Sequence, residues 1–460
     1  MNTKIMKFGG TSVGTPENIK KVIAIVSKTK QPVLVVVSAY TKVTDQLIEM
    51  ANCAVSGKEY ISLFEKVSIR HVEAIKELIA DSSRLQKTEK AVQKTLQELK
   101  KILTGVELIK ELSPKTLDLI MSFGERLSAY TISQAFIDFG VDAEYVDTRT
   151  LIRTDNSFGR AKVDVVQTEK NLRACMKKYP KKLKILTGFI AATKNKETTT
   201  LGRGGSDYTA SVVGAALAAK AIEIWTDVDG VLTADPRRVK SAFSIPSMNY
   251  KEAMEMSHFG AKVIYSPTMI PAFKKHIPLV IKNTFNPDFP GTIISNTTSN
   301  GYSIKGISSI SDISLILVQG AGMVGVPGVA ARLFGALAHA AVSVILITQA
   351  SSEHTICIAV DASSAPRAEE ALTEEFKSEV RDHTIDEIFV EKNLSIIAVV
   401  GEQMKKKSGV AGSVFGALGK SGVSVIAIAQ GSSERNISLV VAKKDEEIAL
   451  QTIHQAFFNK

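Results

Sequence analysis

The sequence predicts an α/β protein: a doubly wound domain with a mainly parallel sheet, followed by a smaller unit that occurs twice. Near the N-terminus a strand, a helix and a second strand follow one another, and each strand runs into a polar loop. The second strand, Val33–Val37, is an almost wholly β-branched run typical of a strand covered on both faces. A long internal repeat near the C-terminus predicts the duplicated part.

The remaining elements of the first part can be expected in chain order. Strand Lys4–Phe8 leads into the turn Gly9-Gly10-Thr11-Ser12, and Pro16 opens a helix that reaches about Val26. A helical region follows from about Thr44 to Lys110, and Pro114 separates it from a new helix. Further strands are expected at Asp142–Val146, Leu183–Ile190, Ala221–Trp225 and Pro278–Ile281, and further helices at Ala210–Ala219 and Met254–Val263. Thr198–Leu201 leads into a glycine-rich turn. The Pro-, Gly- and Asn-rich stretch from Phe285 to about Asn300 predicts a linker and a domain boundary.

The stretch Gly202-Arg203-Gly204-Gly205-Ser206-Asp207 predicts a ligand-binding turn. Its glycines permit positive φ and close approach of a ligand, and Ser206 is a candidate N-cap for the helix that follows. A glycine turn at a helix N-terminus offers free N–H groups to anionic oxygens. A tight strand-to-helix connection would explain the glycines equally well, but such a turn requires neither Arg203 nor Asp207.

Two copies of one unit lie 81 residues apart near the C-terminus, without an insertion, as the pairs Gly328/Gly409, Phe334/Phe415 and Gln349/Gln430 show. Each copy predicts the order β-α-β-β-α. In the first copy these elements are Ile313–Val318, Val329–Ala340, Val342–Ile347, Thr355–Val360 and Pro366–Ser378, and the strand Glu387–Val390 closes it. The second copy lacks a closing strand, and we expect Tyr302–Ile307 to supply it, because an unpaired sheet edge favours association. The two units would then be interlocked.

Composition excludes several classes of protein. Of the 460 residues 45% are hydrophobic, yet no apolar run approaches the ~18 residues of a membrane span, and no secretory leader is expected. The net charge of +10 comes from dispersed lysine clusters without interleaved aromatic residues, which argues against nucleic-acid binding. Three scattered cysteines suit a reducing cytoplasm, and seven histidines without ligand spacing predict no transition-metal site.

Three motifs in one chain, Lys7–Val13, Gly202–Ala210 and Trp225–Val231, closely resemble those of the aspartate kinases in the amino-acid kinase superfamily. The repeat resembles the pair of ACT domains that bind effector amino acids in that family, and Ile347–Gln349 with Ile428–Glu434 resembles its threonine-sensitive branch. The resemblance implies an amino-acid kinase fold, a three-layer α/β/α sandwich, over residues 1–295. It also implies two interlocked ferredoxin-like ACT units, one over 313–391 and one formed by 302–310 with 392–460.

The reaction that the resemblance implies is phosphoryl transfer from Mg·ATP to the β-carboxylate of aspartate, the first step of lysine, threonine and methionine biosynthesis. A carboxylate is already ionised at neutral pH, so catalysis rests on positioning and charge neutralisation, with ATP and Mg²⁺ as the cofactors and no protein metal site. Matching positions imply catalytic Lys7 and Asp207; aspartate contacts Ser38, Thr44, Glu125, Arg203 and Ser206; and nucleotide contacts Lys7, Gly9, Gly10, Thr226, Asp227, Arg237 and Lys262. Leu232 and Tyr265 depart from the family pattern, which often has tyrosine and histidine there.

The same resemblance implies feedback regulation by threonine or lysine through the ACT units, which would also join the chains as a homodimer or a dimer of dimers. The effector contacts expected are Met323, Val326, Val329, Gln349, Ser352, Glu353 and Gln430. Two alternatives stay open: a superfamily kinase for acetylglutamate, glutamate or uridylate, which does not explain the duplicated tail, and an amino-acid sensor without catalysis, which does not explain Lys7, Arg203 and Asp207 together.

Overall fold

The computed structural model describes residues 3–260, 264–297, 302–349, 354–431 and 433–458. The chain folds into two compact units. The first comprises Met1–Val231, Ser244–Tyr250 and Val263–Ser299, and the second comprises Leu232–Phe243, Lys251–Lys262 and Asn300–Lys460. Among the described residues, no helix is both long and apolar enough to cross a membrane.

The first unit is built on an eight-stranded sheet in the order β10-β12-β11-β9-β1-β2-β6-β3. β11, β9, β1, β2, β6 and β3 run parallel to one another, whereas β12 is antiparallel to β11 and parallel to the edge strand β10. The strands are β1 (Lys4–Phe8), β2 (Val33–Val37), β3 (Ala143–Val146), β6 (Leu183–Thr187), β9 (Ala221–Thr226), β10 (Ser247–Asn249), β11 (Leu279–Asn283) and β12 (Thr292–Ser295). The mainly parallel sheet expected from the sequence is therefore confirmed.

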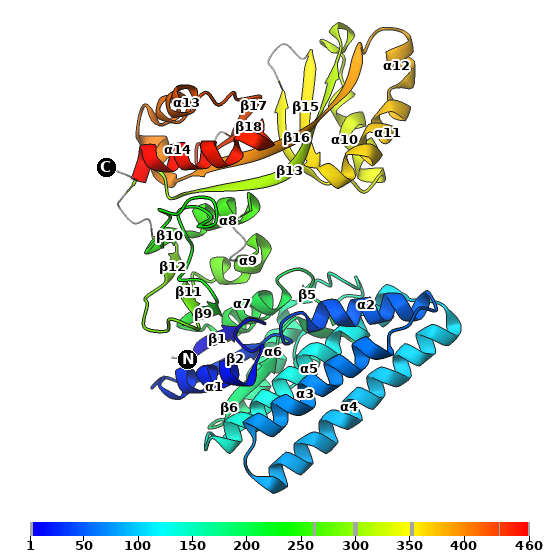
Figure 1. The fold of residues 1–460 in the computed structure, drawn as a ribbon, viewed down its shortest axis with the longest axis vertical. Coiled ribbons are helices and arrows are strands. Elements are labelled where there is room, and N and C mark those ends of the chain that lie inside the picture. Colours follow the sequence, from blue (N-terminus) through cyan, green and yellow to red (C-terminus); the bar gives the residue numbers. More distant parts are fainter. Residues whose placement is uncertain (1–2, 261–263, 298–301, 350–353, 432, 459–460) are drawn as a thin grey trace. The chain divides into compact units, whose positions relative to one another are not determined.

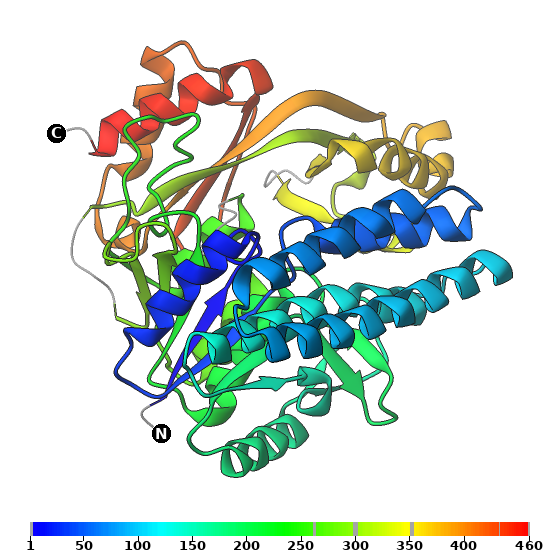
Figure 2. The ribbon, with the colours of Figure 1, turned by 60° about the horizontal axis from the view of Figure 1, so that its bottom comes forward.

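Helices cover both faces of this sheet, because the strands are apolar on both sides. On one face of the sheet, Met6 and Phe8 of β1 belong to a core cluster with Phe123. Ile5 points to the other face, where a Cβ added at Gly214 would lie 3.6 Å from it. These contacts confirm the expected three-layer arrangement (Figures 1 and 2). The helices are α1 (Pro16–Ser27), α2 (Val43–Val55), α3 (Ile61–Leu78), α4 (Ser82–Ile109), α5 (Pro114–Asp138), α6 (Val165–Lys178), α7 (Gly205–Leu217) and α9 (Ser266–Lys274).

Several local expectations need correction. The helical region after Thr44 is divided into α2, α3 and α4, because Gly57 adopts a positive φ of 64° and the Asp81 carboxylate caps α4 by accepting from the Arg84 N–H. The expected strand Leu183–Ile190 is interrupted at Phe189, whose φ is 64°, and continues as β7 in a small second sheet. That sheet has the order β5-β4-β7-β8 and consists of β4 (Arg153–Thr154), β5 (Val163–Asp164), β7 (Ile190–Thr193) and β8 (Thr198–Thr200).

The stretch expected to be a linker contains β12, which pairs with β10 and β11 inside the main sheet. Thr292 holds it there, because its hydroxyl accepts from the Val231 N–H and donates to the Ile245 carbonyl. The described part of this stretch, residues 285–297, therefore belongs to the first unit and is not a free connection.

The second unit contains one six-stranded antiparallel sheet in the order β14-β15-β13-β16-β18-β17. β13 and β16 are long strands that run side by side through both repeats (Figure 1). Residues 313–319 of β13 pair with β15 in the first repeat, and residues 306–310 of β13 pair with the second half of β16 in the second repeat. The expected interlock is confirmed, with the closing strand beginning at Gly306 rather than Tyr302.

Apart from the short helix Lys377–Arg381, which only the first repeat has among the described residues, the remaining elements occur in the same order in each half of this unit. The strands are β13 (Gly306–Gln319), β14 (Val344–Gln349), β15 (Thr355–Asp361), β16 (Glu387–Val400), β17 (Ala427–Gln430) and β18 (Asn436–Ala442). The helices are α8 (Tyr250–His258), which precedes the repeats, and α10 (Val329–His339), α11 (Ala365–Glu375), α12 (Lys377–Arg381), α13 (Val410–Lys420) and α14 (Glu446–Phe458).

Two segments that the sequence assigns to the first domain are part of the second unit. Arg238, in Leu232–Phe243, forms an ion pair of 2.5 Å with buried Glu446 of α14. The Glu402 N–H donates to Glu252, in Lys251–Lys262, at 2.9 Å. The division of the chain by contacts therefore differs from the expected boundary at residue 295.

Candidate active site

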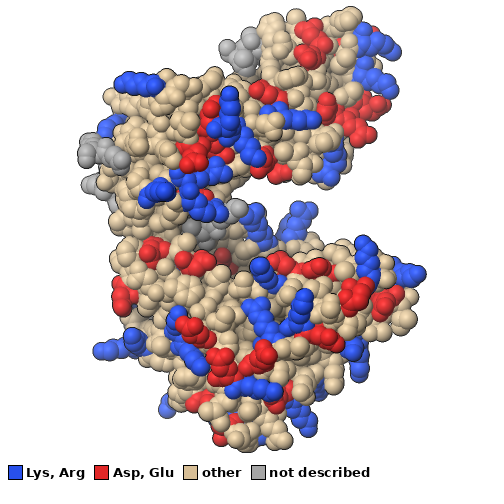
Figure 3. Space-filling model, in the orientation of Figure 1, with Lys and Arg blue, Asp and Glu red and all other residues tan. Residues whose placement is uncertain are grey.

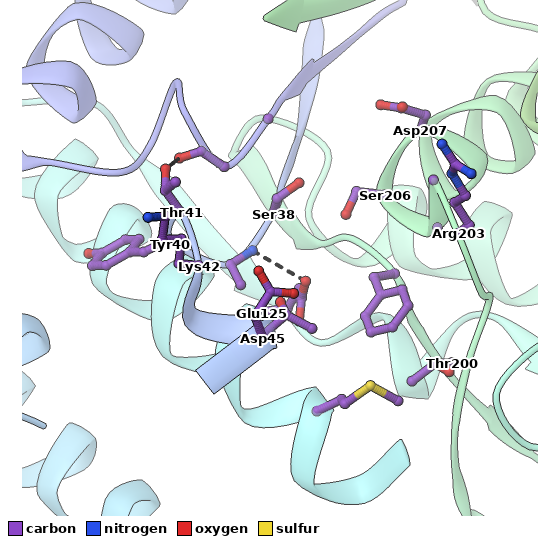
Figure 4. A pocket seen from close by; sticks show the side chains of 18 of the residues that line it. Ser38, Tyr40, Thr41, Lys42, Asp45, Glu125, Thr200, Arg203, Ser206 and Asp207 are labelled. Carbon is purple, nitrogen blue, oxygen red and sulfur yellow. Dashed lines mark hydrogen bonds between the residues drawn. The ribbon is translucent and has the colours of Figure 1, made fainter. Parts of the chain in front are cut away.

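One cavity of about 700 Å³ lies at the carboxyl ends of the central parallel strands of the first unit. β9, β1, β2 and β6 are neighbours in the sheet, so the turns that follow them meet at one edge. Side chains from β1, from the turn after β2, from α5 and from the N-terminus of α7 line this cavity (Figure 4).

The glycine turn before α7 has the backbone that the sequence predicts. Gly202 and Gly204 adopt φ values of 74° and 68°, a region that favours glycine. Gly204 is the N-cap of α7, and Ser206 lies in the first helical turn, so the expectation that Ser206 caps the helix is wrong. Ser206 nevertheless lines the cavity from the side of α7, opposite Ser38 (Figure 4).

Lys7 and Asp207 form the central ion pair of the cavity. Lys7 Nζ lies 2.6 Å from Asp207 Oδ1, and both side chains are nearly buried, with 10% and 13% of their surface exposed. β1 supplies the lysine and the first turn of α7 supplies the aspartate, so the pair joins the glycine turn to the central sheet. A partly dehydrated ammonium in this position presents positive charge to any anion that enters.

Glu125 on α5 is buried and lines the same cavity. Its Oε1 accepts from the Ala39 N–H at 3.3 Å, and no hydrogen-bond donor among the described residues reaches Oε2. Burial raises the pKa of Glu125 to about 8, although backbone N–H groups and the Lys7 ammonium act in the opposite direction. A buried carboxyl with a free oxygen is suited to bind a cationic group.

The structure brings most of the expected site residues together. Those that line the cavity are Lys7, Gly9, Gly10, Ser38, Thr44, Glu125, Arg203, Ser206, Asp207, Thr226 and Asp227. Arg203 is exposed, and its guanidinium lies 5.6 Å from the centre of the Tyr265 ring, so the tyrosine that departs from the family pattern supports this arginine.

Two expected nucleotide contacts are not found there. Arg237 does not line the cavity; it belongs to the second unit, is exposed and pairs with Asp235 at 2.6 Å. Lys262 lies outside the described residues. Leu232 also belongs to the second unit.

Sequence reasoning missed Arg70 of α3, which connects the two turns that follow β1 and β2. Its Nη1 donates to the Thr41 carbonyl and its Nη2 to the Gly14 carbonyl, both at 2.7 Å. Thr41 Oγ1 in turn donates to the Gly10 carbonyl at 2.8 Å. Thr41, Lys42 and Asp45 also line the cavity without having been predicted (Figure 4). No sequence signal marks Arg70, because its partners are main-chain atoms.

The residues expected to contact an effector do not all line one cavity of the second unit. Gln349 and Gln430 line one cavity, whereas Met323 is buried in the core and Val326 and Val329 do not line that cavity. Ser352 and Glu353 lie outside the described residues. The described residues contain no group of three His, Cys, Asp or Glu side chains that could hold a metal ion. Positive and negative side chains are intermixed on the face that Figure 3 shows.

Comparison with known proteins identifies relatives of the whole chain. Residues 2–283 match the family model described as the amino acid kinase family, and residues 316–376 and 397–457 match an ACT domain model. The chain is 38% identical to bifunctional aspartokinase/homoserine dehydrogenase 2, chloroplastic, of Arabidopsis thaliana, over 99% of this chain and 50% of that protein. It is 32% identical to aspartokinase 1, chloroplastic, of the same plant, over 99% of this chain and 80% of that protein. The chain thus spans about half the length of the bifunctional curated relatives it matches.

Solved structures resemble the chain over its full length. The crystal structure of E. coli aspartokinase III in complex with aspartate and ADP has a TM-score of 0.84 and 28% identity, and each chain is covered to 99%. The structure of the same enzyme in complex with lysine and aspartate has a TM-score of 0.80 and 29% identity, with full coverage of both chains.

Proposed function

Since the chain belongs to the amino acid kinase family and, within it, to the aspartokinases, we propose that it transfers the γ-phosphoryl group of ATP to the β-carboxylate of L-aspartate. The observation that carries this proposal is the one cavity that a nearly buried lysine–aspartate pair, a glycine turn, a buried carboxyl and an exposed arginine all line. The substrate is an amino acid with two carboxylates and one ammonium group. The cavity offers it cations and an anion.

In the proposed mechanism an oxygen of the β-carboxylate attacks the γ-phosphorus, the bond to the β,γ-bridging oxygen breaks, and ADP leaves. The products are 4-phospho-L-aspartate and ADP. No general base is needed, because the attacking carboxylate is ionised at neutral pH. Lys7 stabilises the negative charge on the phosphoryl oxygens, and Asp207 holds the ammonium in position at 2.6 Å. Mg²⁺ would take its ligands mainly from phosphates and water, and Asp227, which lines the cavity directly after β9, would supply a carboxylate.

Arg203 and Glu125 bind the substrate in this proposal. The planar guanidinium of Arg203 donates two parallel hydrogen bonds to a carboxylate, and the Glu125 carboxylate accepts from the α-ammonium. Ser38, Thr44 and Ser206 add hydroxyl groups on the walls of the same cavity. Gly9, Gly10, Thr226 and Asp227 lie at the ends of β1 and β9, where we place the phosphates.

The substrate assignment is tested by measuring ATP consumption with aspartate, glutamate and N-acetylglutamate, and by trapping the acyl phosphate with hydroxylamine. Of these three acceptor substrates, we expect only aspartate to give an acyl phosphate. Turnover of glutamate or N-acetylglutamate at a comparable rate would reassign the chain within the superfamily, and no turnover of any of them would favour a sensor without catalysis.

Glu125 predicts a pH dependence of substrate binding. Its pKa of about 8 means that the carboxyl is largely protonated below that value and becomes an anion as the pH rises. The anion binds the α-ammonium more strongly, so kcat/KM for aspartate should increase from about pH 6.5 to about pH 8.5. The Glu125→Gln variant should have a lower kcat/KM and should lose this rise. A rise of the same size in Glu125→Gln would show that another group titrates.

We also propose that the second unit binds a regulatory amino acid, threonine or lysine, and that the chain assembles as a homodimer or a dimer of dimers through this unit. The ACT domain matches support the regulatory role, and for E. coli aspartokinase III a complex with lysine and aspartate is described. Gln349 and Gln430 are the expected contacts that lie on one cavity. A cytoplasmic location stays a prediction.

A further inference from the structure

Arg70 on α3 does not line the active-site cavity, yet it is hydrogen-bonded to two turns that do. The first turn, residues 9–14, follows β1, and the second turn, residues 38–42, follows β2. Arg70 Nη2 donates to the Gly14 carbonyl of the first turn and Nη1 donates to the Thr41 carbonyl of the second, both at 2.7 Å. One planar guanidinium therefore spans both turns.

The two turns are also in direct contact with each other. A Cβ added at Gly14 would lie 2.6 Å from Thr41 Oγ1 and 3.0 Å from the Gly10 carbonyl oxygen, so a larger residue would displace the second turn. Thr41 Oγ1 donates to that same Gly10 carbonyl at 2.8 Å. The distance between the turns is thus set by close packing and by two polar contacts, the Arg70 guanidinium and the Thr41 hydroxyl.

The backbone of the second turn needs support from outside the turn. Lys42 adopts a φ of 67°, a left-handed conformation that is unfavourable for a residue with a side chain. It is also the N-cap of α2, and its side chain makes no capping hydrogen bond. Such a conformation persists where the surrounding structure holds it. The carbonyl that Arg70 Nη1 binds belongs to the peptide bond between Thr41 and Lys42, so Arg70 supplies this support.

An aromatic stack, not a carboxylate, holds Arg70 in place. Its guanidinium carbon lies 5.6 Å from the centre of the Tyr40 ring, which stacks on the His71 ring at 4.5 Å. Burial lowers the pKa of His71 to about 3, and the Arg70 cation acts in the same direction, so this ring is neutral at physiological pH. Among the described residues no acidic side chain pairs with Arg70, and its hydrogen bonds go to the two main-chain carbonyls.

We propose that Arg70 is a positioning residue for phosphoryl transfer, which fixes the second turn against the first and so sets the distance between bound aspartate and the phosphates. The proposal rests on the function proposed above and deepens it. There, Gly9 and Gly10 of the first turn face the phosphates, whereas Ser38 of the second turn and Thr44 just after it contact aspartate. Displacement of reacting groups by about 1 Å lowers a rate by about 100-fold, so the link between the turns acts on kcat.

Steady-state kinetics of Arg70→Lys and Arg70→Ala test the proposal. We expect kcat to fall about tenfold or more in both variants, with KM for aspartate and for ATP within about threefold of the parent values, because Arg70 touches neither substrate. Lysine keeps the charge and the aliphatic chain, but one ammonium does not span two carbonyls as the guanidinium does. Arg70→Lys therefore decides the outcome even if Arg70→Ala does not fold.

Arg84→Ala is the matched control for these variants. Arg84 is also a partly buried arginine on a helix of the same unit, and its Nη1 pairs with Asp138 at 2.9 Å. It neither lines the cavity nor binds either turn. We expect Arg84→Ala to retain kcat within about twofold, since it removes an ion pair that takes no part in the reaction.

Hydrogen–deuterium exchange gives a second readout, which does not depend on turnover. The Val13 N–H donates to the Gly9 carbonyl at 3.2 Å in the first turn, and the Val43 N–H donates to the Tyr40 carbonyl at 3.0 Å in the second. Both amides should exchange about tenfold faster or more in the Arg70 variants, as loss of hydrogen bonds from a charged donor predicts. In Arg84→Ala both should exchange as in the parent chain.

Four results would overturn the proposal. They are a kcat of Arg70→Lys within about threefold of the parent, an equal loss of kcat in Arg84→Ala, a rise in either KM as large as the fall in kcat, and unchanged exchange of both amides in the Arg70 variants. Exchange is measured without substrates. An inactive parent chain would therefore contradict the proposed function, whereas unchanged exchange would contradict the role of Arg70 in joining the turns.

Discussion

Replacing Lys7 by methionine is expected to lower kcat by about 10²–10³-fold, the loss typical for a donor aimed at charge in the transition state. Methionine keeps an unbranched side chain of similar length, so packing beside Gly9 is retained while the positive charge is removed. In the parent protein Lys7 Nζ lies 2.6 Å from Asp207 Oδ1. A Cβ added at Gly9 would lie 3.6 Å from the same nitrogen. KM for either substrate should change much less than kcat.

Lys4→Met is the matched control for this variant. Lys4 lies on the same strand and also forms an ion pair, with Glu223 at 2.7 Å, but it does not line the cavity. We expect the control to retain kcat within about twofold, because a partly exposed ion pair contributes ~1 kcal/mol or less to stability and nothing to the reaction. A kcat of Lys7→Met within threefold of the parent would remove Lys7 from the mechanism.

The fold could be predicted where periodicity and turn residues act locally. Four of the five residues of Val33–Val37 are buried, on both faces, as its β-branched run implies, and the register of the repeat placed Gln349 and Gln430 at equivalent strand ends. β12 was missed because its four residues lie in a stretch whose prolines and glycines predict a linker, whereas the pairing that makes it a strand comes from β10 and β11.

The site could be predicted in its charged residues but not in its support. Lys7 and Asp207 are 200 positions apart in the sequence, and only the motifs that contain them indicate that they belong to one site. The 2.6 Å ion pair shows that the two side chains are in contact. Arg70 could not be found in this way, because its two partners are main-chain carbonyl oxygens. Every residue has such an oxygen, so no residue type in the sequence marks the contact. Arg237 belongs to the second unit because its segment packs there, and the neighbouring Arg238 forms an ion pair with Glu446. Packing between residues so far apart in the sequence could not be predicted from the local sequence pattern.

Replacing Arg203 by alanine is expected to raise KM for aspartate about 10- to 100-fold, the range for losing hydrogen bonds to a charged group, and to leave KM for ATP within about twofold. The guanidinium is available for a substrate carboxylate, since it rests on the Tyr265 ring and no carboxylate of the described residues lies within ion-pair distance of it. Arg203→Lys should recover only part of the loss, because an ammonium cannot form the bidentate contact.

Arg160→Ala is the control, since Arg160 is exposed beside Gly202 and does not line the cavity. Steady-state kinetics with each substrate varied in turn would decide the assignment: a higher KM for ATP with an unchanged KM for aspartate would place Arg203 on the nucleotide instead.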